Sequence, residues 1–533
     1  MSFKNTLKNI LNNDSVIICT IYFFTYGLLA LNNGIYWDDW TFWGVSDQGL
    51  REQLFENGNV GFYYIFSFLY KLTISPVLIR IIIFFLYLLT TFIIYNLLTD
   101  LEFVSEKMRL LISLSYFLFP VNSAKITISS FPYALLVFIF FLGFYFLNYY
   151  LRSGYFIHRV IFSILFFCSF LSNSLLVFYL IPILYFFYFH YSKKNSFHNL
   201  FKVSMGHVEL FISPVLFWIL KSKFFKPYGL FEDYNQITFQ KILYAPLMYC
   251  YSFFYSLFEP INISFNKSVS ILTYALIITL VIYSLIRHKK DHIGNKNEKQ
   301  FLKVFMLGLV LFFCGVFAYN AVGQQPRLND WSHRHQLLVP LGASFILFFG
   351  LKTIFFKLQF SKGLENFIYA FIMAGFIVSN INIFLSYQRD WYKQLSLIQH
   401  FKDSDVLKKN TSFIFINNTK NLDVAHNKSK RDYRFYEYSG LLKYTFNNEN
   451  RFGVDKSRLD LFGIDKYRFL ANYSYNNVSN YSFKEFDYYV SIENGDYFPK
   501  DRSVLKLMVM SVIDPEYFKK RIKRMVNLEY KKV

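Results

Sequence analysis

The chain has 533 residues, of which 54% are hydrophobic and 22% aromatic, and its mean hydropathy is +0.27. A soluble protein of this length would divide into several domains of more mixed composition, so these values exclude an ordinary soluble enzyme. The formal net charge of +21 lies largely in clusters between apolar stretches, without a compact basic and aromatic module, which excludes a nucleic-acid-binding protein. Four cysteines (Cys19, Cys168, Cys250 and Cys314) lie in apolar segments without metal-ligand spacing, so we expect no disulfide framework.

The apolar residues gather in stretches of about 18 to 24 residues, a length that crosses a bilayer as a helix. With the N-terminus in the cytoplasm, the Lys and Arg clusters predict an all-α polytopic membrane protein with about eleven transmembrane helices. The predicted spans are Ser15–Leu31, Pro76–Leu98, Leu110–Val121, Phe131–Tyr150, Val160–Leu171, Leu175–Tyr191, Val203–Leu220, Ser268–Ile286, Phe301–Tyr319, Leu337–Leu351 and Phe367–Leu385.

Two further apolar segments, Val60–Leu72 and Tyr244–Leu257, are short for a span, and we expect them to lie along the membrane surface. This assignment keeps the large basic clusters on one side of the membrane. It leaves outer-face loops at residues 32–75, 221–267 and 320–336.

From about Ser386 the composition becomes polar and rich in Tyr and Asn, which predicts a boundary between a transmembrane module (1–385) and a small α/β domain (386–533) on the outer face. The expected strands are Thr411–Ile416, Tyr488–Ile492 and Val504–Val512, and the expected helices are Arg389–Phe401, Tyr433–Tyr444 and Pro515–Val526. The domain has no glycine-rich phosphate loop and no ordered set of acid and base residues.

The segment Tyr36-Trp37-Asp38-Asp39-Trp40 directly follows the first predicted span, at its outer end. Carboxylates beside lipid are costly, so this pair indicates a function. Asp38 and Asp39 can accept a proton, hold the hydroxyls of a sugar, or bind a divalent cation such as Mg²⁺ or Mn²⁺. The alternative is an acidic anchor within a belt of interfacial tryptophans.

The outer loop from Asn320 to Gln336 contains a second group of candidates: Arg327, His333, Arg334 and His335. Basic residues on the outer face oppose the charge bias of the rest of the chain. The planar guanidinium group fits two phosphate oxygens, so a lipid-linked phosphate is the expected ligand. The alternative is that the arginines pair with Asp330, Asp38 or lipid headgroups.

Lys125 lies in a predicted outer turn, where it would meet either the same phosphate or lipid headgroups. The chain contains no HExxH, GxSxG, Walker or CxxC pattern, so metalloprotease, hydrolase, ATPase and thiol-redox functions have no support.

The first span with its acidic end, followed by Gly58-Asn59-Val60-Gly61-Phe62-Tyr63-Tyr64, resembles the GT-C superfamily of integral membrane glycosyltransferases. Arg80 and the Phe119-Pro120 turn are similar to the same pattern, and the resemblance covers the topology of about residues 1–385. The His-Pro-Pro signature that is usual between Gly58 and Tyr63 is missing here, which leaves the subfamily and the donor sugar open.

The resemblance implies a polyprenyl-phosphate-linked sugar donor, with Asp38 or Asp39 as base or metal ligand and Arg327 or Arg334 on the lipid phosphate. The expected function is transfer of the sugar to a surface glycan or lipid, on the outer side of a bacterial inner membrane. Two other functions fit the same features. One is a polysaccharide polymerase or ligase acting on undecaprenyl-linked glycans. The other is a transporter or flippase of lipid-linked sugars, although the chain shows no internal repeat.

Overall fold

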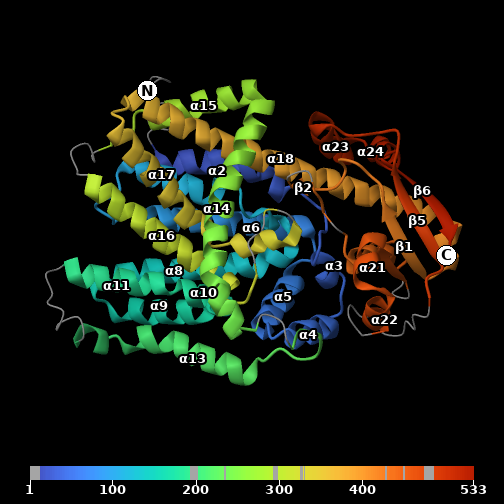
Figure 1. Ribbon diagram of the computed structural model, residues 1–533, viewed down its shortest axis with the longest axis horizontal. Coiled ribbons are helices and arrows are strands. Elements are labelled where there is room, and N and C mark those ends of the chain that lie inside the picture. Colours follow the sequence, from blue (N-terminus) through green and yellow to red (C-terminus); the bar gives the residue numbers. More distant parts are fainter. Residues whose placement is uncertain are drawn as a thin grey trace.

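The computed structural model describes residues 13–192, 202–232, 236–291, 298–324, 328, 330–426, 429–431, 433–447, 451–472 and 485–533. It has a large helical part and a smaller C-terminal part built around a four-stranded sheet (Figure 1). Most long helices of the first part lie side by side, and the sheet lies beyond one end of them, at the right of the view.

The helical part begins with α2 (Asp14–Ala30) and contains helices of very different length. The α-helices that follow are α3 (Asp39–Phe42), α4 (Asp47–Glu56), α5 (Val60–Leu72), α6 (Pro76–Thr99), α7 (Glu106–Leu118), α8 (Phe131–Ser153), α9 (Phe156–Ser169), α10 (Asn173–Phe178), α11 (Leu180–Ser192), α13 (Val208–Phe224), α14 (Phe239–Ser270), α15 (Leu272–Ile286), α16 (Glu298–Asn320) and α17 (Val339–Lys357). Short 3₁₀ helices are η1 (Ser123–Ile126), η2 (Ile128–Ser130), η3 (Gly229–Phe231) and η4 (Asp330–Gln336).

Helix ends follow local sequence. Ser105 accepts a hydrogen bond from the backbone N–H of Met108 at the start of α7 (3.2 Å), and Pro76 occupies the first turn of α6. Gly154 ends α8 in the left-handed conformation with φ +71°, which favours glycine.

Six helical segments in the described ranges are long and apolar enough to cross a membrane, or seven if α14 and α15, which meet at a sharp bend, count as one further span. They are Pro76–Thr99, Ile128–Ser153, Asn173–Tyr191, Gln300–Asn320, Val339–Lys357 and Lys362–Asp403. The other five expected spans are also helical but have only 13 to 17 residues. At a rise of 1.5 Å per residue they measure about 20 to 26 Å, less than the roughly 30 Å of a hydrocarbon core.

The two expected surface helices have different outcomes. Val60–Leu72 is a separate helix with the predicted bounds, α5. Tyr244–Leu257 lies instead within α14, a continuous helix of 32 residues that contains Pro246 and Pro260, so the prediction of a short separate helix was wrong.

Ion pairs tie together the helix ends that the predicted topology places inside. Lys289, after α15, pairs with Asp14 at the start of α2. Asp291 pairs with Lys107 (2.9 Å) and with Lys352 of α17 (3.0 Å), and Lys352 also contacts Glu365 (2.9 Å). These helix ends therefore meet at one end of the bundle, and the loop with Asp38, which follows the other end of α2, lies at the opposite end.

Helix α18 (Lys362–Asp403) joins the two parts without an intervening loop. Its 42 residues run through the predicted boundary at residue 385, and the expected helix Arg389–Phe401 is its C-terminal section. Figure 1 shows this helix leaving the helical part and ending beside the sheet.

The sheet has the strand order β4-β1-β5-β6. Strands β1 (Ser412–Asn417), β4 (Phe452–Asp455) and β5 (Tyr488–Asn494) are parallel, and β6 (Val526–Lys532) pairs antiparallel with β5. The remaining elements of this part are α19 (Asp405–Lys409), β2 (Ala425–His426), β3 (Ser429–Lys430), α20 (Phe435–Phe446), α21 (Lys456–Phe462), α22 (Ile464–Asn472), α23 (Asp501–Ile513) and α24 (Pro515–Lys523).

The predicted strands Thr411–Ile416 and Tyr488–Ile492 correspond to β1 and β5, and the predicted helix Tyr433–Tyr444 corresponds to α20. The prediction of a strand at Val504–Val512 was wrong, because this segment belongs to helix α23. Its buried residues Val504 and Leu507 are three apart and share one helical face. The expected helix Pro515–Val526 stops at Lys523, and β6 follows it.

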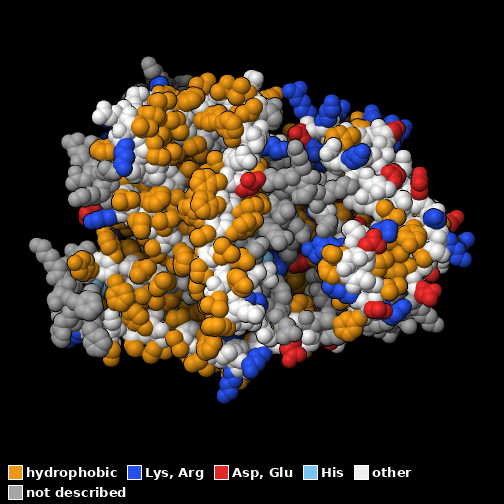
Figure 2. All heavy atoms as spheres, viewed as in Figure 1, with side chains coloured by type: hydrophobic (Ala, Val, Ile, Leu, Met, Phe, Trp, Pro, Cys, Tyr) orange, Lys and Arg blue, Asp and Glu red, His pale blue; other side chains and the backbone are white. Residues whose placement is uncertain are grey.

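The two parts differ in their surfaces. Figure 2 shows one face of the helical part covered mainly by apolar side chains, while Lys, Arg, Asp and Glu are more frequent on the C-terminal part. Exposed apolar residues of the helical part include Trp218 on α13, Phe254 on α14 and Leu280 on α15. An apolar surface of this extent is typical of contact with lipid.

A candidate active site between the helical part and the C-terminal domain

Asp38 and Asp39 are neighbours in sequence but lie in different surroundings. The chain leaves α2, turns at Trp37 with a left-handed φ of +45°, and enters the short helix α3. The Asp39 side chain is completely buried, whereas the Asp38 side chain is 25% exposed.

Asp39 fastens the first loop to the turn before α8. Its Oδ1 accepts a hydrogen bond from the Ser129 backbone N–H (2.8 Å), and its Oδ2 accepts one from the Tyr36 N–H (3.3 Å). Arg80, also fully buried, lies 3.8 Å from Oδ2 and donates hydrogen bonds to the carbonyls of Asn32 (2.9 Å) and Ile126 (2.5 Å). Burial raises the pKa of Asp39 to about 6, against the opposing effects of Arg80 and the Ser129 N–H.

Asp38 is the carboxylate that faces open space. Its Oδ2 accepts a hydrogen bond from Nη1 of Arg334 in η4 (3.2 Å). Its Oδ1 accepts one from the hydroxyl of Tyr436 in α20 (2.8 Å). Three segments that are far apart in the sequence therefore meet at one carboxylate.

All three of these residues line one cavity of about 1040 Å³. His335 of η4, Arg434 of the C-terminal domain and Lys221 of α13 line it as well. Much of its remaining wall is apolar or aromatic: Phe42, Phe62, Phe66, Tyr133, Leu171, Trp218, Phe225 and Phe317. A charged region beside an apolar wall fits a ligand with an anionic head and a hydrocarbon tail.

The other predicted residues of the basic loop differ in their positions. His333 is buried and donates from Nδ1 to the Val121 carbonyl (3.1 Å), so it supports the turn before η1. The His335 ring lies 5.1 Å from the Tyr319 ring and lines the cavity. Arg327 lies outside the residues that the structure describes.

Lys125 does not line this cavity. It is buried among aromatic rings, where its Nζ donates to the Tyr26 hydroxyl and to the Phe117 carbonyl (3.3 Å). Its Nζ lies 4.1 Å from the Tyr26 ring centroid. Burial lowers the pKa of Lys125 to about 7. Lys125 therefore fastens η1 to α2 and α7 and is absent from the wall of the cavity that Arg334 and Asp38 line.

The contacts of the two carboxylates do not fit a metal ion shared between them. Both oxygens of Asp39 accept backbone N–H groups, and both oxygens of Asp38 accept side-chain donors. In the described ranges, no group of three or more His, Cys, Asp or Glu side chains is arranged to hold a metal ion.

A buried ionic network in the C-terminal domain contacts Trp37 of the first loop. Arg431 donates from Nε and Nη2 to the two oxygens of Asp390 in α18 (2.8 and 3.1 Å) and from Nη1 to Glu437 in α20 (2.5 Å). The same Glu437 oxygen accepts the backbone N–H of Trp37 (3.2 Å). The Arg431 guanidinium also lies 5.3 Å from the Trp37 ring centroid.

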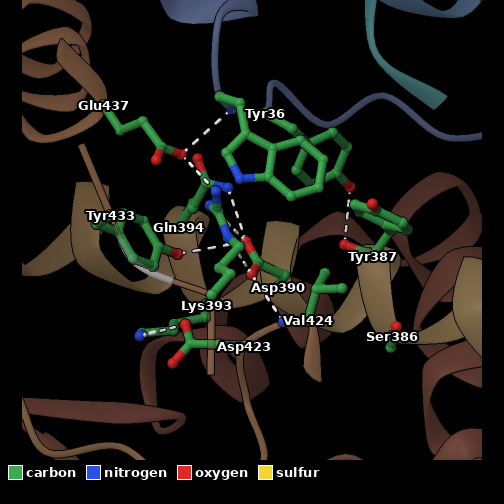
Figure 3. Close-up of polar contacts among 12 residues, drawn as sticks. Tyr36, Ser386, Tyr387, Asp390, Lys393, Gln394, Asp423, Val424, Tyr433 and Glu437 are labelled. Carbon is green, nitrogen blue, oxygen red and sulfur yellow. Dashed lines mark hydrogen bonds and ion pairs between the residues drawn. The ribbon is translucent and has the colours of Figure 1, made fainter. Parts of the chain in front are cut away.

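Figure 3 shows Asp390, Tyr433 and Glu437 converging on this network, with Tyr36 reaching the Tyr387 carbonyl beside it. That hydrogen bond measures 2.7 Å. The C-terminal domain therefore holds Trp37, the residue directly before Asp38. The same domain also contributes Tyr436 to the cavity wall.

Sequence reasoning missed Tyr436, Arg434 and the network around Arg431. The predicted helix Tyr433–Tyr444 includes Tyr436, but no local pattern connects it with a carboxylate 398 positions away. Comparison with protein-family models, with curated proteins and with solved structures finds no match to this chain.

Proposed function

We propose that this chain is a membrane glycosyltransferase that moves a sugar from a polyprenyl-phosphate carrier to a glycan or lipid acceptor on the outer side of a bacterial inner membrane. One observation carries the proposal. Asp38 and Arg334 lie 3.2 Å apart on the wall of one large cavity that is partly apolar. A carboxylate for an acceptor hydroxyl and a guanidinium for a phosphate are the two groups that such a transfer requires.

In the proposed step, Asp38 takes the proton of the acceptor hydroxyl as its oxygen attacks the anomeric carbon of the sugar. The bond between that carbon and the phosphate oxygen breaks, and the phosphate of the carrier leaves with the electron pair. Arg334 stabilises the negative charge on the departing phosphate, and His335 lies beside it on the cavity wall. Asp39 keeps the loop in place and does not contact the substrates.

The apolar wall supports a lipid carrier. Trp218 is 61% exposed on α13 and also lines the cavity, so the cavity continues onto the apolar surface of the helical part. We propose that the polyprenyl chain lies along this surface while its phosphate reaches Arg334.

Purified protein in lipid, supplied with a panel of polyprenyl-phosphate sugars, tests the function. Failure to release the carrier phosphate from any donor in the presence of a broad set of acceptors would contradict it.

We further propose that the five shorter helices complete a GT-C-like arrangement with an N-terminus in the cytoplasm and a C-terminal domain outside. A cysteine introduced at Asp460, exposed on α21, is expected to react with an impermeant maleimide added to intact spheroplasts. A cysteine at Glu102, exposed between α6 and α7, should react only after the membrane is opened. Labelling of Glu102→Cys in intact spheroplasts would contradict this orientation.

Arg334 provides a test of the phosphate contact. Lysine keeps the charge but lacks the fork that binds two oxygens, so Arg334→Lys is expected to lower kcat/KM for the donor by about 10-fold or more. Arg334→Ala should lower it further, by roughly 10²-fold. The measurement is donor-dependent kinetics, with Arg524→Ala as control because Arg524 pairs with Asp496 on the exposed surface of the C-terminal domain. Unchanged kinetics in both Arg334 variants would remove the phosphate from this position.

A further inference from the structure

The contact between Arg334 and Asp38 joins the two groups that the transfer step would need separately. The pair is not deeply buried, because the Arg334 and Asp38 side chains are 26% and 25% exposed. Both also line the cavity, so a ligand that enters the cavity meets both of them. Partly exposed ion pairs contribute little to stability, and a phosphate offers more negative charge and a bidentate geometry to the same guanidinium.

Resting on the proposed function, we infer that the anionic head of the donor and the Asp38 carboxylate compete for Arg334, so that donor binding releases Asp38 from its ion pair. Before the donor binds, the positive charge of Arg334 balances the negative charge of the Asp38 carboxylate. The occupied site holds a carboxylate that is ready to accept the acceptor proton.

Tyr436 makes this exchange possible without loss of position. Its hydroxyl donates to Oδ1 of Asp38 (2.8 Å), whereas Arg334 donates to Oδ2. When Arg334 turns to a phosphate, the hydrogen bond from Tyr436 still holds Asp38 at the cavity wall. Because Tyr436 belongs to the C-terminal domain, that domain keeps the Asp38 carboxylate oriented toward the cavity during the exchange.

The competition predicts an unusual result for ligand binding. Asp38→Asn removes the competing negative charge and keeps nearly the same shape, so the variant is expected to bind an alkyl phosphate about threefold to tenfold more tightly than the unaltered protein. The measurement is calorimetric titration of the purified full-length protein in detergent with dodecyl phosphate, with dodecanol as the uncharged ligand. Affinity for dodecanol should not change.

Two further variants make the result specific. Asp47→Asn removes the same charge from an exposed carboxylate of the same loop that accepts hydrogen bonds from Tyr63 (2.9 Å) and Ser67 (3.1 Å), and it should leave the affinity unchanged. Tyr436→Phe removes the second partner of Asp38, makes the carboxylate depend more on Arg334, and should weaken dodecyl phosphate binding. In the Asp38→Asn background the Tyr436 substitution should have little effect.

Arg334→Gln separates the inference from the proposed function. If Arg334→Gln binds dodecyl phosphate as well as the unaltered protein does, the phosphate site itself is wrong. If Arg334→Gln loses binding but Asp38→Asn does not tighten it, the phosphate site stands and the competition is wrong. If Asp38→Asn does not fold, the sign of the Tyr436→Phe effect decides, and unchanged or tighter binding in that variant overturns the inference.

Discussion

Replacement of Asp38 by Asn is expected to reduce sugar transfer by about 10²-fold or more, the range that loss of a general base produces. Asn retains the shape of the side chain and can still accept the hydrogen bond from Tyr436, but it does not take up a proton from the acceptor. The structure selects Asp38 for this test because its side chain lines the cavity, whereas that of Asp39 is completely buried. The measurement is kcat of purified protein in lipid at saturating donor.

The Asp38 experiment needs a control for protein loss. Asp47→Asn alters the same loop at an exposed position outside the cavity, and it is expected to retain normal transfer. Thermal denaturation of Asp38→Asn in detergent should also match the unaltered protein. A fully active Asp38→Asn variant would contradict the proposed role of Asp38 as general base. It would leave Asp38 only as the ion-pair partner of Arg334.

Replacement of Arg431 by Leu is expected to give the largest loss of stability. Arg431 is buried and pairs with two buried carboxylates, Asp390 (2.8 Å) and Glu437 (2.5 Å). Its removal leaves both carboxylates without their compensating charge, which costs about 3 to 5 kcal/mol. The N–H of Trp37 would also lose a well-placed acceptor, because Glu437 is held by Arg431.

The measurement is thermal denaturation of the full-length protein in detergent together with limited proteolysis of the C-terminal domain. Lys456→Ala is the matched control: it breaks an exposed pair with Asp460 (3.1 Å) within one helix, which contributes about 0.5 kcal/mol or less. A midpoint for Arg431→Leu equal to that of the control would show that the network does not hold the two parts together.

Several elements could be predicted because their signals are local. The α5 segment Val60–Leu72 is an apolar run bounded by Asn59 before it and Thr73 after it, and its predicted bounds agree with the structure. Long apolar runs were predicted as spans for the same reason, and the predictions Pro76–Leu98 and Leu337–Leu351 correspond to the helices Pro76–Thr99 and Val339–Lys357. The shorter helices α7 and α9 were also predicted as helices, at Leu110–Val121 and Val160–Leu171, but with 13 and 14 residues they are shorter than the roughly 20 residues of a typical span.

The sequence by itself determined that most of this chain is apolar helix, that a carboxylate pair follows the first helix, and that basic residues follow α16. Hydrophobic runs and charge positions are properties of neighbouring residues, so they can be read without a structure. Only the tertiary structure decided that Asp38 faces the cavity while Asp39 is buried, that Lys125 lies among aromatic rings, and that Tyr436 donates a hydrogen bond to Asp38 on the cavity wall. It also decided that Val504–Val512 is helical, since this short apolar run fits either a strand or a helix until it packs. The physical reason is common to all four: burial and the hydrogen-bond partners of a side chain depend on segments brought together from distant parts of the chain, such as Asp38 and Tyr436.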